Sequence, residues 1–149
     1  MIADGTGSAR AAARAEVLAE LQDLRRRIRE VEGSVVASTD GLVVAHDLGA
    51  TETYGIQPEG VAALSAVSLG LSQRIADTAS HGELQETITQ GTFGQVITYP
   101  AGDRALLTVL IRAEGETTTV HAEARALAHR VAGLLAHAWQ DDAASWRST

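Results

Sequence analysis

Several residue types are absent or scarce in this chain, and each absence excludes a class of site. The chain has no cysteine, which excludes disulfides and thiolate metal sites. Every basic residue is arginine, and the 12 arginines are outnumbered by 19 acidic residues, for a net charge of −7. A domain with this charge repels phosphate backbones, so we expect no nucleic-acid partner. No apolar run approaches the ~18 residues of a membrane-spanning helix and no signal-peptide core is present, so we expect no membrane span and a cytoplasmic location.

Aromatic residues are also scarce, at 3% of 149 residues, while apolar residues make up 45%. This length and composition predict one soluble domain with an aliphatic, alanine-rich core. Residues 1–13 are rich in small residues without apolar periodicity, which predicts a flexible N-terminal tail. The domain is then expected over 14–140 and a C-terminal tail over 141–149, where Trp146 is the one residue expected to dock.

The spacing of apolar residues predicts three helices. Apolar residues at spacings of three and four indicate a helix over about 12–32, ended by Gly33: Val17, Leu21, Leu24, Ile28 and Val31. A second helix is expected over 58–80, with Pro58 in its first turn. A third is expected over about 117–140, with a buried stripe made of Val120, Ala124, Leu127, Val131, Leu134 and Ala138.

The pair Asp40-Gly41 lies between two apolar runs, which predicts a β-hairpin with a type I′ turn. Its strands, at 34–39 and 42–47, are almost continuously apolar, so both are expected in the middle of a sheet. Three further strands are expected at 84–90, 95–99 and 105–112. The first of these is polar, as an edge strand would be, and the last is the most apolar. The predicted fold is α+β in the order α-β-β-α-β-β-β-α, with a five-stranded antiparallel sheet and helices on both faces.

The helix over 58–80 has two unlike faces. A stripe of Leu64, Val67, Ser68, Leu71, Ile75 and Thr78 is expected to face the sheet. The opposite face is made almost entirely of small residues and contains a mid-helix glycine, which favours close approach by a partner chain. Together with the polar edge strand, this face predicts a partner interface at Ala62, Ser65, Ala66, Leu69, Gly70, Gln73, Glu86, Ile88 and Gln90. Leu69→Arg is therefore expected to weaken dimerisation.

We find no catalytic motif in the sequence. Three histidines of the last predicted helix are eight residues apart, or about 12 Å, too far for one metal ion: His121, His129 and His137. No serine lies in a nucleophile elbow. The run Arg25-Arg26-Arg27-Ile28-Arg29 is either a solvated helix face or a basic docking patch. Arg74 is expected to form a surface ion pair with Asp77 or Asp103. We expect no catalytic, metal or cofactor site.

Several segments together resemble the bacterial form of the roadblock (dynein light chain roadblock) family. They are the hairpin Ser38-Thr39-Asp40-Gly41-Leu42-Val43-Val44-Ala45, the helical segment Ala63–Leu71, and the strands Gly91–Tyr99 and Leu106–Ile111. The resemblance implies the fold predicted above. It also implies a homodimer in which edge strands pair into a ten-stranded sheet and the second helices pack together. It further implies small Ras-like GTPases as partners, regulated or docked without catalytic residues from this chain, sometimes beside a sensor histidine kinase.

Two other functions are compatible with the sequence. A small-ligand sensor domain would have a closed, largely apolar cavity with a few convergent polar groups. A purely structural part of a larger signalling complex would need no such cavity. The homodimeric GTPase regulator or scaffold is the function that the helix, the edge strand and the resemblance favour together.

Overall fold

The computed structural model describes residues 4–113 and 117–147, with side chains described over 7–51, 55–113 and 117–140. Its elements follow the predicted order, with one short 3-10 helix (η1) added before α2. They are α1 (Asp4–Arg27), β1 (Val31–Ser38), β2 (Val43–Asp47), η1 (Gly49–Tyr54), α2 (Pro58–Thr78), β3 (Thr87–Gly91), β4 (Gly94–Ala101), β5 (Ala105–Arg112) and α3 (Thr118–Arg147). The predicted α+β fold is confirmed. Trp146, expected to dock, has its side chain outside the described part.

The five strands form one antiparallel sheet in the order β2-β1-β5-β4-β3. The predictions that β5 is central and that the polar strand β3 lies at an edge are confirmed. The prediction that β2 is central is wrong, because β2 lies at an edge of the sheet, next to β1. Its apolar composition has another cause: Val44 packs against the core on one sheet face and Val43 against the core on the other.

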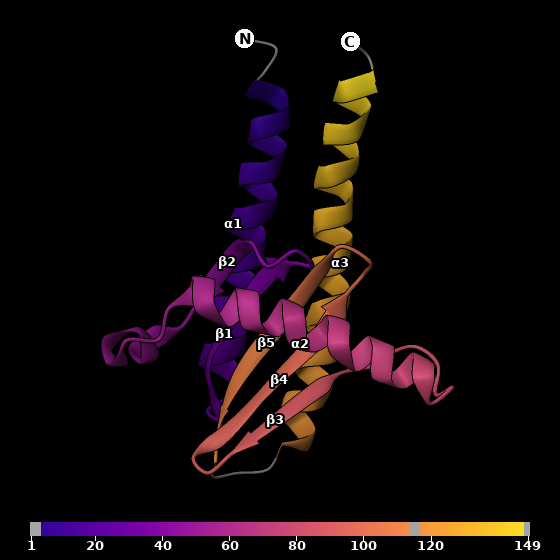
Figure 1. Cartoon of the computed structure of the whole chain (residues 1–149). Helices are drawn as coiled ribbons and strands as arrows, with labels where there is room; N and C mark the ends of the chain where they lie inside the picture. Colours follow the sequence, from indigo (N-terminus) through magenta and orange to yellow (C-terminus); the bar gives the residue numbers. More distant parts are fainter. Residues whose placement is uncertain (1–3, 114–116, 148–149) are drawn as a thin grey trace.

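Helices cover both faces of the sheet, as predicted. Helices α1 and α3 lie side by side on one face, and α2 lies across the strands on the other (Figure 1). The larger core lies under α1 and α3 and contains Leu21, Val36, Tyr99 and Leu127. The smaller core lies under α2. It contains Val35, Ala37, Leu48, Ala62, Leu106 and Leu110.

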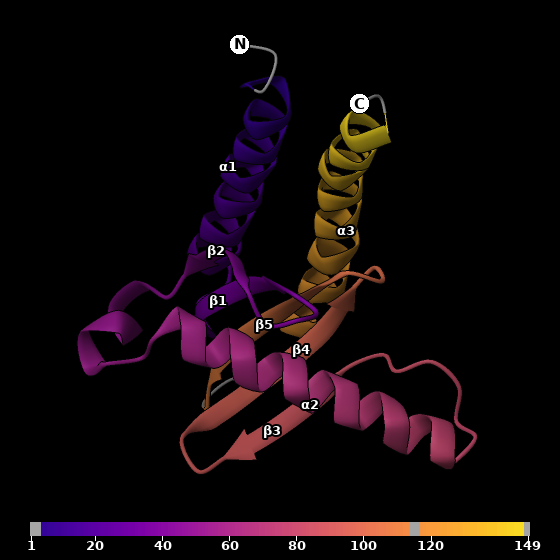
Figure 2. The same cartoon turned by 45° about the horizontal axis from the view of Figure 1, so that its top comes forward.

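Helices α1 and α3 are antiparallel and extend well beyond the sheet, so that the start of α1 and the end of α3 lie at the same end of the molecule (Figure 2). Both helices are longer at this end than the sequence predicted, because alanine-rich segments have high helix propensity and each helix supplies the other with a partner. At its other end α1 is shorter than predicted. It ends at Arg27, and Val31, which was expected in the helix, begins β1. That 1–13 and 141–149 behave as separate tails stays a prediction.

The Asp40-Gly41 turn joins β1 and β2 as predicted, but the turn type differs. Gly41 has φ +90°, whereas Ser80 alone among the described non-glycine residues has a positive φ, so Asp40 has an ordinary one. The Gly41 amide donates to the Ser38 carbonyl at 2.9 Å, and the Ser38 amide donates to the Leu42 carbonyl at 2.9 Å. This is a three-residue loop with glycine at its left-handed position. A side chain at Gly41 would also lie 3.3 Å from the Cα of Ala63, so this turn packs tightly against α2.

Candidate interaction surface

Helix α2 presents to the sheet the small-residue face that its sequence predicted to meet a partner chain. Ala62 and Ser65 are buried, and Ala66 and Leu69 pack against the smaller core. The predicted orientation is therefore wrong, and Ala62 and Ser65 are covered within the protomer rather than available to a second chain. Small side chains are needed here because α2 crosses directly over the strands and the Gly41 turn. They let the helix backbone approach closely, which large aliphatic residues would prevent.

The opposite face of α2 is a solvent-exposed apolar stripe of Leu64, Val67, Leu71 and Ile75, which we call the outer stripe. Their exposed fractions are 74%, 61%, 57% and 68%. The four residues follow one another at spacings of three, four and four, so they form one continuous row about 16 Å long. Single exposed leucines are ordinary, but a contiguous apolar row on a soluble domain marks an interaction site.

Two other predicted interface residues of α2 have different surroundings. Gln73 is half-buried and holds the chain that leaves the helix: its side-chain amide donates to Asp77, and its carbonyl oxygen accepts the Leu84 amide at 3.1 Å. Gly70 is exposed, and a side chain there would meet nothing within 4 Å in the protomer. Arg74, close to the outer stripe, forms no ion pair with Asp77 or Asp103 within the described chain.

The outer edge of β3 is the second feature of this surface. Within the described chain β3 pairs only with β4, so its backbone groups along the other edge have no strand partner. Such an edge can pair with a strand of another chain. Ile88 and Gln90 lie opposite Ile97 and Gln95, which places their side chains on the α3 side of the sheet. An edge-to-edge contact would therefore use the backbone N–H and C=O groups of Ile88 and Gln90 rather than their side chains.

Glu86, just before β3, is engaged inside the chain. Its carboxylate pairs with Arg125 and lies 3.2 Å from Nδ1 of His121, whose ring also hydrogen bonds to the Tyr99 hydroxyl at 3.0 Å. Burial raises the pKa of Tyr99, and the nearby Glu86 carboxylate adds to this, so the phenol stays protonated. His121 is thus half-buried in a polar cluster. The cluster ties the start of β3 to α3.

The arginine run at the end of α1 is partly neutralised within the chain. Arg25 donates from Nε to Asp47 at 2.6 Å, and this hydrogen bond raises the pKa of Arg25. Arg27 donates to Asp23 at 2.6 Å and also pairs with Glu123. These contacts favour a structural role over a docking patch. No cluster of three or more histidine, aspartate or glutamate side chains in the described part could hold a metal ion, and none of its helices is long and apolar enough to cross a membrane.

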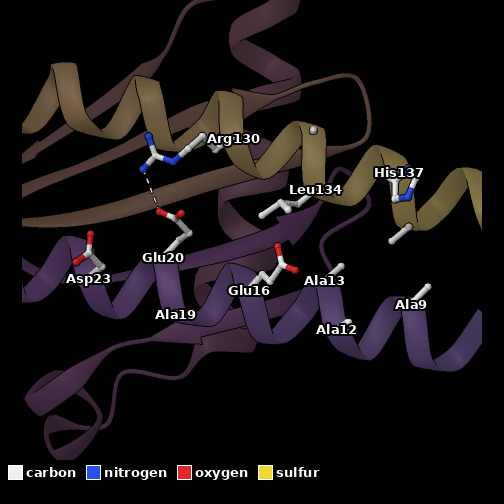
Figure 3. A pocket seen from close by; sticks show the side chains of 12 residues that line it. Ala9, Ala12, Ala13, Glu16, Ala19, Glu20, Asp23, Arg130, Leu134 and His137 are labelled. Atoms are coloured by element: carbon white, nitrogen blue, oxygen red, sulfur yellow. Dashed lines mark hydrogen bonds and ion pairs between the residues drawn. The ribbon is translucent and has the colours of Figure 1, made fainter.

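A groove of about 840 Å³ lies between α1 and α3, lined from Ala9 to Asp23 on α1 and from Arg130 to Ala138 on α3 (Figure 3). Alanine is the commonest residue in its walls, and Leu134 lies between the helices. The ion pair from Arg130 to Glu20, 3.0 Å long, bridges the two helices. A second cavity, of about 570 Å³, lies where both helices meet the β1–β2 and β4–β5 turns. Both cavities are on the sheet face opposite the outer stripe.

The chain resembles known proteins over most of its length. MglB in a tetrameric arrangement superposes with a TM-score of 0.74 at 20% identity, covering 85% of this chain and 93% of that one. A Roadblock/LC7 domain from Streptomyces avermitilis gives 0.71 at 19% identity, covering 79% and 96%. Two uncharacterized proteins of Methanocaldococcus jannaschii, MJ0310 and MJ1340, are each 30% identical over 77 residues, or 52% of this chain and 64% of their own length.

At these identities the two solved structures support the fold alone. A family model gives the stronger result, since the Roadblock/LC7 domain matches residues 17–111, from the middle of α1 to the end of β5. The matched region contains the hairpin, α2 and the edge strand β3. The chain therefore belongs to the Roadblock/LC7 domain family.

Proposed function

We propose that this protein is a non-catalytic, homodimeric scaffold or regulator of a small Ras-like GTPase in bacterial signalling. The observation that carries the homodimer is the outer stripe of α2, four large apolar side chains that are each more than half exposed. A second copy is the occupant that fits best, because the open edge of β3 lies on the same side of the molecule as the C-terminal end of α2 (Figures 1 and 2). One two-fold contact can then pair strand edges and cover both stripes.

The GTPase partner is inferred from family membership. The outer stripe and the strand edge would let two copies associate, and a composite surface built from two protomers would then be available to the GTPase. Stimulated hydrolysis would come from reshaping the switch loops of the GTPase. The aliphatic filling of both cores counts against a ligand sensor with its site inside the fold.

The test is nucleotide-dependent co-elution. Candidate small GTPases from the same organism are loaded with GDP or a GTP analogue, mixed with the full chain, and separated by size-exclusion chromatography. We expect a complex with one GTPase in one nucleotide state. If no candidate forms a complex in either nucleotide state, the GTPase assignment is refuted. The homodimer is tested separately, by the mass of the free protein.

Arg74 provides the test of the non-catalytic role, because it is exposed and close to the outer stripe. Removing an arginine finger lowers GTP hydrolysis by about 10³–10⁵-fold. We expect Arg74→Ala to leave any stimulated hydrolysis within about twofold of the wild-type rate. A loss of that larger size, with binding retained, would make this chain a direct contributor to catalysis.

A further inference from the structure

The described residues that line the cavity of about 570 Å³ include three arginines, in a chain that is acidic overall. Arg10 and Arg14 come from α1, and Arg104 comes from the β4–β5 turn. Among the lining residues whose side chains the structure describes, Asp40 is the only carboxylate, and it accepts a hydrogen bond from the Ser38 hydroxyl of its own turn. Three guanidinium groups therefore line one concave space within a chain of net charge −7, which concentrates positive charge there.

Two of these arginines have donors available to a ligand. Arg14 has neither a hydrogen bond nor an ion pair within the described chain. Arg104 stacks its guanidinium 4.8 Å from the centroid of the Trp139 ring. Stacking uses the face of the guanidinium and leaves its N–H edge free to donate, so Trp139 orients Arg104 without consuming its donors. The Arg104 carbonyl also accepts the Thr39 amide at 3.0 Å, which joins the two turns that frame the cavity.

The arrangement on α1 also favours a bound anion. Arg10 and Arg14 are four residues apart, so they project from the same face of the helix. Guanidinium groups bind phosphate and carboxylate oxygens through paired hydrogen bonds. The cavity volume is within the range of small-molecule sites, about 300–1,000 Å³.

We propose that this cavity binds a small molecule carrying at least two negative charges on phosphate or carboxylate groups, held by Arg14 and Arg104 with Trp139 as the supporting wall. The site lies on the sheet face opposite the outer stripe, so it does not depend on the proposed homodimer or on a GTPase. It gives the domain a place where a metabolite could act while α2 is covered by a partner.

Isothermal titration calorimetry of the full chain with pyrophosphate and with citrate tests this. We expect saturable binding with a Kd below about 1 mM for at least one probe, weakened by added salt. Tighter binding of pyrophosphate assigns the site to phosphates, and tighter binding of citrate assigns it to carboxylates. Arg14→Ser and Arg104→Ser should each raise the Kd at least about tenfold.

Arg26→Ser is the matched control, because Arg26 is an exposed arginine of the same helix outside the cavity. It should leave the Kd unchanged. A Trp146→Phe background isolates the fluorescence of Trp139, which should change on binding. The proposal is overturned by the absence of saturable binding of both probes up to about 10 mM, or by an equal loss of affinity in Arg26→Ser and Arg14→Ser. The titration is repeated with the Leu71→Arg variant, in which the homodimer should be lost. Probe binding that persists in this monomer shows that the site does not depend on the proposed function.

Discussion

Replacing Leu71 with arginine tests the homodimer most directly. Leu71 lies in the middle of the outer stripe and is 57% exposed in the protomer, so the change should alter protomer stability by no more than about 0.5 kcal/mol. In a dimer that covers the stripe, each copy would instead bury a new charge without a partner. Leu71→Arg should therefore weaken dimerisation while leaving the stability of the folded protomer almost unchanged.

The magnitude follows from the exposed fractions. Fully burying a large aliphatic side chain stabilises by about 2 kcal/mol, so the four residues, 57–74% exposed, have about 5 kcal/mol per protomer left to gain, or about 10 kcal/mol in a dimer. This is comparable with the cost of association, about 4–15 kcal/mol. Losing the contribution of Leu71 from both copies removes about 2 kcal/mol, or about 30-fold in Kd. Two unpaired charges near a two-fold axis should raise the loss to at least about 100-fold.

The assay is sedimentation velocity over a range of protein concentrations, with thermal unfolding followed by circular dichroism. The matched control is Leu42→Arg, because Leu42 is 66% exposed but lies in the β1–β2 turn, away from the outer stripe. We expect a dimer for the wild type and for Leu42→Arg, and a folded monomer for Leu71→Arg. A wild type that is monomeric at about 100 μM, or a Leu71→Arg variant that dimerises like the wild type, would refute the assignment of the outer stripe.

Three further changes test the packing of α2. Leu69→Arg puts a charge against the smaller core and should lower the free energy of unfolding of the protomer by about 2–4 kcal/mol, measured in urea. A variant that is monomeric but as stable as the wild type would show that Leu69 lies in the dimer interface instead. Gly41→Ala should cost about 1–3 kcal/mol, because φ is +90° and the Cα of Ala63 is 3.3 Å from the new Cβ; an unchanged unfolding midpoint contradicts this packing. Gly70→Ala, made in the Leu71→Arg background, should raise the Tm by about 2–4 °C through helix propensity, and a lower Tm would mean an unseen contact.

The sequence alone determined the elements and their order. The period of Val17, Leu21 and Leu24 specifies a helix whose buried face is the one that packs on the sheet, and the Asp40-Gly41 pair specifies a turn. The apolar run of β5 specifies a central strand, and the polar residues of β3 specify an edge. These features follow from local backbone chemistry and from hydrophobic periodicity, which do not require knowledge of neighbouring elements.

Only the tertiary structure decided which face of α2 is buried. Hydrophobicity by itself favours burial of Leu64 and Leu71, yet the mostly small face lies inward, because Ala62 and Ser65 let the helix backbone pack closely on the strands. The structure also brought Arg14, Arg104 and Trp139 together from three elements far apart in the chain. The pattern along the chain records how hydrophobic a residue is, whereas the space available to it depends on elements that only folding brings together.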